Sequence, residues 1–179
     1  DTLHRLLLAS KGHRANLLSK EFNHIGVAKA ATLIDAVRAE RGADSCLTID
    51  AGDTIQGTPL AYYYAKIEPI TDGTVHPMAT AMNALGYDAA ALGNHEFNFG
   101  SAIFKGVLKA ATFPVLGANV TDTGAYGLAE AKVKPYVEKA VGPEGIKVAI
   151  LGITNHRVPN YELPSNIPGL SFSDPIAKA

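Results

Sequence analysis

The stretch that decides the fold is CLTIDAGD, residues 46–53, and its pattern returns as AAALGNHE at residues 89–96. Each is a short apolar run that ends in glycine and polar residues, as a buried strand followed by a loop does. A third apolar run, FPVL at residues 113–116, gives way to GAN at residues 117–119. We therefore predict three short strands, each of which ends in a polar loop.

Helical patterns precede and separate these strands. Apolar residues recur at helical spacing from Ile25, and Gly42 ends that run. Pro77 opens a second predicted helix, which Gly86 closes, and a third is predicted over residues 101–111. The alternation of helix and strand predicts an α/β layered fold.

The C-terminal part adds antiparallel structure. Residues 132–141 and 146–153 predict two strands of a hairpin, which GPEG at residues 142–145 turns. The expected fold class is therefore a layered α/β sandwich with mixed β-sheets. The proline-rich tail from Val158 predicts an ordered surface segment with no helix before Asp174.

The composition restricts the class of protein. A chain of 179 residues, 47% of them apolar, suits one domain or a large piece of one. The net charge is −1 and no Lys/Arg cluster is present, so a nucleic-acid polymer is not an expected partner, whereas a small phosphorylated molecule is. Cys46 is the only cysteine, which excludes an internal disulfide and a Cys-rich zinc site. No apolar run is long enough for a membrane span.

Polar side chains follow all three predicted strands: Asp50 and Asp53 the first, Asn94 and His95 the second, and Asn119 the third. In α/β sheets, ligands collect at the carboxyl ends of the strands. Carboxylate, amide and imidazole groups suit divalent metals of the zinc, manganese or iron kind. Two such ions roughly 3.5–4 Å apart would hold a phosphoryl group and activate a bridging water. A histidine beside a ligand could then protonate the leaving oxygen.

Two blocks carry a family resemblance: GDTIQG at residues 52–57 and GNHEF at residues 93–97 resemble signature blocks of calcineurin-like metallophosphoesterases. The surrounding sequence resembles the branch that contains 5′-nucleotidases and 2′,3′-cyclic-nucleotide 2′-phosphodiesterase/3′-nucleotidases. Supporting stretches are GVAK (26–29), MNALGYD (82–88), FPVL (113–116) and ANV (118–120). The resemblance implies an enzyme that hydrolyses phosphoesters of small nucleotides with two divalent metal ions of the zinc, manganese or iron type.

The resemblance also implies residue roles. Asp53 would be the ligand that bridges the two metals, Asn94 a ligand of the second metal, and His95 the catalytic histidine. Asn98 would be its catalytic partner. The 5′-nucleotidase branch usually has Asp at this position and the cyclic-phosphodiesterase branch commonly has Asn, so Asn98 favours the cyclic-nucleotide and 3′-nucleotide branch. A 5′-nucleotidase or UDP-sugar hydrolase is the alternative.

Other family features do not match. The family opens with Asp-x-His. Asp1 and His4 are separated by one residue too many, and Lys11-Gly12-His13 has the histidine but no aspartate. The later histidine blocks do not occur before Ala179. We therefore expect residues 1–179 to be the N-terminal part of a metallophosphoesterase domain, without the later ligand blocks and the C-terminal substrate domain. A non-catalytic fragment or degenerate homologue is the competing reading. The resemblance implies a periplasmic, secreted or cell-surface location, although no signal peptide is recognisable.

The remaining polar and aromatic residues have plainer interpretations. We expect Glu96 to make structural hydrogen bonds, and Gln56 either to line the site or to hold its loop. Asp50 and Asn119 would support the site or form turns. The other expectations are a helix entry at His76, a surface loop at His156 and a helix face at residues 62–64 packed on the core.

Overall fold

The computed structural model describes residues 24–70 and 75–178. The expectations placed on His4 and His13 therefore lie outside the described residues. The α-helices are α3 (His24–Arg41), α4 (Pro59–Tyr62), α5 (Pro77–Ala84) and α6 (Gly100–Leu108). The strands are β1 (Ile49–Asp50), β2 (Ala89–Ala91), β3 (Val115–Leu116), β4 (Val120–Asp122), β5 (Tyr136–Val141), β6 (Ile146–Leu151) and β7 (Leu170–Phe172).

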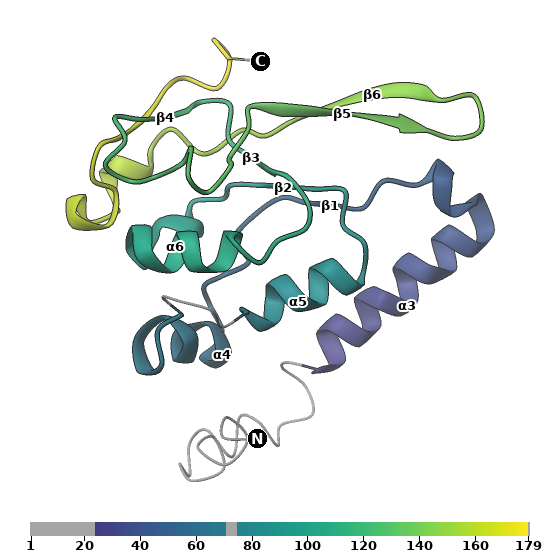
Figure 1. Cartoon of the computed structure of the whole chain (residues 1–179), viewed down its shortest axis with the longest axis horizontal. Helices are drawn as coiled ribbons and strands as arrows, with labels where there is room; N and C mark the ends of the chain where they lie inside the picture. Colours follow the sequence, from purple (N-terminus) through teal and green to yellow (C-terminus); the bar gives the residue numbers. More distant parts are fainter. Residues whose placement is uncertain (1–23, 71–74, 179) are drawn as a thin grey trace, which may run out of the picture.

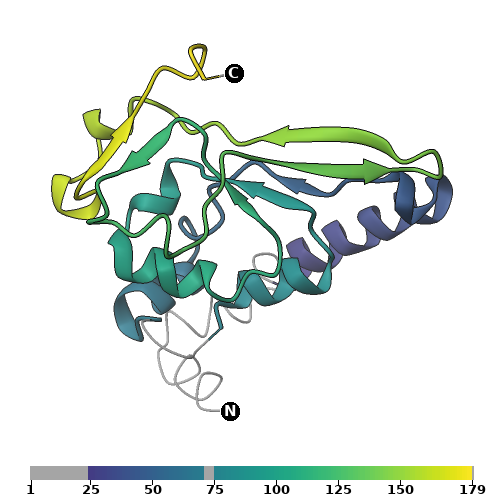
Figure 2. The same cartoon turned by 45° about the horizontal axis from the view of Figure 1, so that its top comes forward.

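The three strands predicted from apolar runs form one parallel sheet in the order β1-β2-β3. Helices α5 and α6 lie on one side of this sheet and the β5–β6 hairpin on the other (Figures 1 and 2). Side chains alternate between the two faces. Ala90 packs with Met82 and Phe104 from the helices, whereas Ala89 packs with Ile150 from the hairpin. The layered α/β fold is thus confirmed.

The first strand is shorter and more exposed than predicted. Of the expected strand over residues 46–49, only Ile49 lies in β1, and Asp50, which we expected in the loop, is its second residue. Ile49 is 48% exposed. Within the described residues β1 is the edge of the sheet, so one side of its backbone has no strand partner there. The helix predicted from Ile25 is present as α3, and the guanidinium of Arg38 ties it to the carbonyls of Leu85 and Gly86.

The predicted hairpin is confirmed, with Val141 opposite Ile146. Parallel and antiparallel pairs nevertheless fall into separate sheets of the described chain. A single parallel bridge between Leu116 and Lys134 joins the hairpin to β3.

The tail is more structured than predicted. It contains two short 3-10 helices, η4 (Val158–Asn160) and η5 (Pro164–Asn166), so the expectation of no helix before Asp174 was wrong for these single turns. Proline occupies the first turn of each, where its missing N–H costs nothing. Strand β7 follows and pairs antiparallel with β4, a pairing that we did not predict.

The expected aromatic helix face is correct only in part. Tyr63 and Tyr64 are buried, but Tyr62 is 53% exposed. Successive helical residues point about 100° apart, so three in a row cannot all face the core. The helix that carries them changes from α4 to a π-helical turn, η2 (Tyr63–Ile67).

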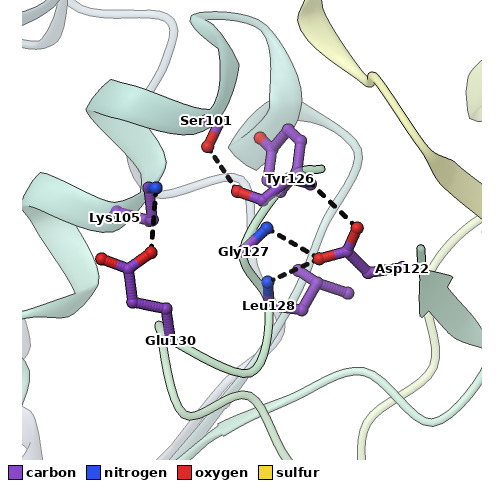
Figure 3. A network of polar contacts seen from close by, with 7 residues as sticks. All are labelled: Ser101, Lys105, Asp122, Tyr126, Gly127, Leu128 and Glu130. Carbon is purple, nitrogen blue, oxygen red and sulfur yellow. Dashed lines mark hydrogen bonds and ion pairs between the residues drawn. The ribbon is translucent and has the colours of Figure 1, made fainter. Parts of the chain in front are cut away.

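A carboxylate organises the loop that follows β4 (Figure 3). The side chain of Asp122 accepts backbone hydrogen bonds at 2.7–3.0 Å from four residues: Gly124, Tyr126, Gly127 and Leu128. Two contacts then tie the loop to α6: the Ser101 hydroxyl donates to the Tyr126 carbonyl, and Lys105 pairs with Glu130 at 3.0 Å. This network fixes Tyr126 in the core beside Phe97 and Phe104.

Candidate active site

Two glycines bring the first two strand-end loops into backbone contact. A Cβ added to Gly52 would lie 2.2 Å from the nitrogen of Gly93, which is closer than real Cβ atoms approach. Gly52 also has φ +96°, a conformation that L side chains rarely adopt. The loop after β1 and the loop after β2 therefore meet at the carboxyl edge of the parallel sheet, where ligands of such sheets bind.

Asp53 lies directly in this contact. Its Oδ1 accepts a hydrogen bond from the backbone N–H of His95 at 2.9 Å. A Cβ on Gly93 would come within 2.3 Å of the same oxygen, so only glycine fits there. Asp53 has φ +66°, a left-handed conformation that is uncommon for residues other than glycine, although Asp and Asn adopt it more readily than most. Such backbone strain concentrates at functional sites.

Glu96 is a buried residue whose carboxylate binds the backbone of the Asp53 loop. It is 5% exposed, and its two carboxylate oxygens accept the backbone N–H groups of Asp53 at 2.8 Å and Thr54 at 2.7 Å. Burial raises the pKa of Glu96, while these two hydrogen bonds act in the opposite direction. The expected structural role of Glu96 agrees with these contacts.

The residues that follow β2 form a short 3-10 helix, η3 (His95–Phe97), with Asn94 before it. Phe97 is fully buried and packs on Phe104 of α6 and Phe172 of β7, so it anchors the turn. Asn94 is half-buried, and its side chain has no hydrogen-bond partner within residues 24–70 and 75–178.

His95 is oriented by a chain of polar side chains. Its Nδ1 lies 2.5 Å from Oδ1 of Asn98. The Asn98 amide nitrogen donates in turn to a carboxylate oxygen of Glu162, in the tail after η4. Glu162 was not among the predicted site residues, because it lies far along the chain in a segment read as surface. Burial acts to raise the pKa of Glu162, but hydrogen bonds from Asn166, Leu163 and Asn98 and the proximity of His95 lower it overall.

A search of protein-family models finds no match for the chain. A curated protein of Bacillus subtilis, the trifunctional nucleotide phosphoesterase protein YfkN, is 35% identical over 176 residues, which cover 89% of this chain and 12% of that protein. A 2′,3′-cyclic-nucleotide 2′-phosphodiesterase/3′-nucleotidase of Salmonella typhimurium is 36% identical over 71% of this chain and 20% of its own length. The crystal structure of the calcineurin-like phosphoesterase YfkN superposes with a TM-score of 0.69 and 32% identity, covering 85% of this chain and 47% of that one.

This chain belongs to the calcineurin-like phosphoesterases. It spans about an eighth to a fifth of the length of these two curated relatives. In the described part of this phosphoesterase, no helix is both long enough and apolar enough to cross a bilayer.

The other predicted polar residues of the phosphoesterase serve the scaffold. Asp50 accepts hydrogen bonds from the Gly52 N–H at 2.7 Å and the Thr54 hydroxyl at 3.0 Å, which shapes the turn before Asp53. Asn119 is fully buried and exchanges two hydrogen bonds with the backbone of Thr154. The Thr154 hydroxyl donates to the Leu92 carbonyl, so Asn119 supports the β2 loop from behind.

The peripheral residues lie largely as expected. His76 is buried at the start of α5, where Nδ1 accepts the Met78 N–H at 3.1 Å, as predicted for a helix entry. His156 is exposed, and Gln56 is half-buried in the Asp53 loop. Tyr161, which we did not single out, lies near the site: burial and the charges of Asp53 and Glu162 raise its pKa.

The donors present suit a divalent metal only in part. Among the residues that the structure describes, no group of three or more His, Cys, Asp and Glu side chains could hold an ion. What converges is the Asp53 carboxylate and the Asn94 loop, both of which offer oxygen. Oxygen donors at adjacent strand ends match the divalent ions that calcineurin-like phosphoesterases generally use.

Proposed function

We propose that this chain is part of an enzyme that hydrolyses nucleotide phosphoesters with divalent metal ions. The observation that carries the proposal is the meeting of Asp53, Asn94 and His95 where the loops after β1 and β2 touch. The relatives support the substrate class, since their names describe nucleotide phosphoesterases.

Two ions of the zinc, manganese or iron type would complete the site. Asp53 would be shared between them, and Asn94 would hold one. When bound, the ions supply positive charge for the phosphoryl group and lower the pKa of an attacking water. The Asp53 carboxylate is already fixed by its hydrogen bond to the His95 N–H, so it would need little rearrangement to bind.

His95 would exchange a proton with the substrate. Its Nδ1 faces Asn98, which leaves Nε2 as the ring nitrogen that can reach an oxygen of the substrate. From there it could stabilise charge on the phosphoryl group or protonate the leaving oxygen. The pairing with Asn98 supports both residues as members of the catalytic group.

Within the nucleotide phosphoesters we favour 2′,3′-cyclic nucleotides and 3′-nucleotides. Asn98 favours this branch, and the Salmonella relative bears that activity in its name. A 5′-nucleotidase or UDP-sugar hydrolase is the second candidate, because several similar curated proteins are named 5′-nucleotidase. Related 5′-nucleotidases are often periplasmic or secreted, which supports the same location for this protein.

The test is a hydrolysis assay of the complete natural protein, depleted of metal and then supplied with manganese or zinc. The substrates are 2′,3′-cyclic AMP, 3′-AMP, 5′-AMP and UDP-glucose. We expect metal-dependent release of product, highest for the first two substrates. Absence of hydrolysis with every substrate and both metals would leave the reading of a degenerate homologue.

A further inference from the structure

We propose that Glu162 is a positioning residue for His95 and acts on it through Asn98. The proposal rests on the proposed function, because positioning matters only if His95 takes part in the reaction. It concerns a residue of the tail, separated by 64 positions from the Asn98 side chain that it contacts.

Within the described part of the chain, the Glu162 carboxylate is the acceptor in each of its hydrogen bonds. Glu162 is 9% exposed. Its Oε1 accepts from the backbone N–H of Leu163 and from Nδ2 of Asn166, each at 2.9 Å, and its Oε2 accepts from Nδ2 of Asn98. An ionised carboxylate has no proton to donate, so the side of Asn98 that faces Glu162 must be its NH₂ group.

This fixes the direction of the Asn98 amide. With NH₂ toward Glu162, the carbonyl oxygen of Asn98 faces Nδ1 of His95 at 2.5 Å. A carbonyl only accepts, so Nδ1 must carry the proton. The neutral ring then presents an unprotonated Nε2, which can take up a proton and afterwards deliver it to a leaving oxygen. The hydrogen bond from Asn98 to Glu162 holds the Asn98 amide, whose oxygen in turn restrains the imidazole ring.

A purely structural role for Glu162 is the competing explanation, since the same carboxylate holds Leu163 and Asn166 of the tail. The two explanations differ in which hydrogen bonds the side chain at position 162 has to make. Tail anchoring requires an acceptor toward Leu163 and Asn166. Positioning of His95 requires in addition that the side chain at position 162 determines which end of the side chain at position 98 faces His95.

Glutamine at position 162 separates these requirements. The glutamine side chain has one oxygen and one NH₂ group, so Glu162→Gln cannot accept both from Asn98 and from the side of Leu163 and Asn166. If its oxygen keeps the tail contacts, its NH₂ faces Asn98, which then loses its acceptor and is free to turn over. We expect kcat to fall about 10- to 100-fold with a small change in KM, as for partners that orient site residues.

A second substitution should restore the activity. In Asn98→Asp combined with Glu162→Gln, the carboxylate at 98 accepts from Nδ1 of His95 and from the NH₂ group of the introduced glutamine, whose oxygen keeps both tail contacts. Asn98→Asp alone places two carboxylates in contact and should be impaired. The double variant should therefore regain most of the kcat lost by Glu162→Gln. Glu138→Gln, an exposed position on β5, is the matched control and should behave as wild type.

A readout that does not depend on activity is the tautomer of His95. Nitrogen NMR of histidine-labelled, metal-free protein distinguishes a protonated Nδ1 from a protonated Nε2 when the ring is neutral, with His95→Gln identifying the resonances. We expect a protonated Nδ1 in the wild type and the double variant, and a loss of this preference in Glu162→Gln.

The possible results distinguish the positioning role of Glu162 from the proposed function. An unchanged tautomer in Glu162→Gln, or no recovery of kcat in the double variant while wild type is active, overturns the positioning role and leaves the proposed function standing. A complete protein that hydrolyses no nucleotide removes the proposed function. The NMR comparison then still decides whether Glu162 sets the state of His95.

Discussion

Oδ1 of Asp53 lies 2.9 Å from the backbone nitrogen of His95 and accepts its hydrogen bond, so the carboxylate after β1 is aligned by the turn after β2. The same carboxylate belongs to a residue with φ +66°. Substitution can separate the negative charge of Asp53 from its geometry. Asparagine keeps the side-chain orientation and the backbone conformation but loses the charge.

Asp53→Asn should leave the free energy of unfolding within about 0.5 kcal/mol of wild type, since Asn tolerates the left-handed conformation and keeps an oxygen toward the His95 N–H. Asp53→Ala should cost roughly 1–2 kcal/mol, because it loses both. Both variants should lose metal and hydrolysis in the complete protein. Urea unfolding and elemental analysis of the dialysed proteins measure the two effects. Full metal retention by Asp53→Asn would contradict the assignment of Asp53 as a ligand.

His95→Ala should leave metal bound but slow turnover about 10²- to 10⁴-fold, the range for the loss of an acid/base group. The backbone N–H that aligns Asp53 is retained in this variant, so the ligand geometry should persist. Metal analysis beside steady-state kinetics is the measurement. Loss of the metals from His95→Ala would mean that the imidazole is a ligand. His156→Ala, at an exposed loop position, serves as the control.

Stability should fall in mildly acidic solution because of His76. Burial lowers its pKa from 6.5 to about 4. As pH falls through 6.5 the unfolded chain gains a proton at this residue, whereas the folded protein does not until about pH 4. The contribution is therefore fully present above pH 6.5 and declines by up to roughly 3 kcal/mol toward pH 4. The control variant is His76→Asn, which keeps an acceptor for the Met78 N–H. Urea unfolding across this pH window should show a free energy of unfolding that depends less on pH in the variant than in the wild type.

Asp122→Asn should destabilise the protein by roughly 2 kcal/mol at neutral pH, because an NH₂ group would replace an oxygen that accepts from the backbone. Burial acts to raise the pKa of Asp122, but four backbone N–H groups lower it overall. A lowered carboxyl pKa stabilises the fold above the unfolded value of 3.8 and ceases to do so as pH falls through the folded value. The difference from wild type should thus shrink in strong acid. Asp35→Asn on the exposed side of α3 is the matched control.

The 179-residue chain on its own should be a poor catalyst. Within the described residues no group of three or more His, Cys, Asp and Glu side chains could hold an ion. The two proposed ligands, Asp53 and Asn94, would hold a pair of mutually repelling ions only weakly. An assay of the isolated chain beside the complete protein, each with 2′,3′-cyclic AMP in manganese and zinc, measures the ratio. Comparable turnover that disappears in Asp53→Ala would show that the chain holds further ligands.

The parts of the fold that local sequence determines were predictable. The hairpin follows from GPEG at residues 142–145, and the three parallel strands follow from apolar runs that end in glycine. The pairing of β4 with β7 was not predictable, because it joins Val120 to Phe172 across a long segment and each strand has only three residues. The exposure of Ile49 was missed because hydrophobicity predicts burial without saying what covers the residue.

The candidate site also contains residues that the sequence predicted and one that it did not. Asp53, Asn94 and His95 stand in compact blocks whose spacing is visible in the sequence. Glu162 stands in no such block, and its relation to Asn98 exists only once the tail has folded back over η3. A buried Glu in a proline-rich segment looks the same in sequence as an exposed one, so no local signal could have found it.

The contact between Gly52 and Gly93 also limits how the protein can diverge. Since a single methyl group on either residue would collide with the other loop, a change at one position cannot be compensated at its neighbour. Any folded variant of this chain must therefore keep the two loops at this close separation. A saturation library should tolerate only glycine at both 52 and 93.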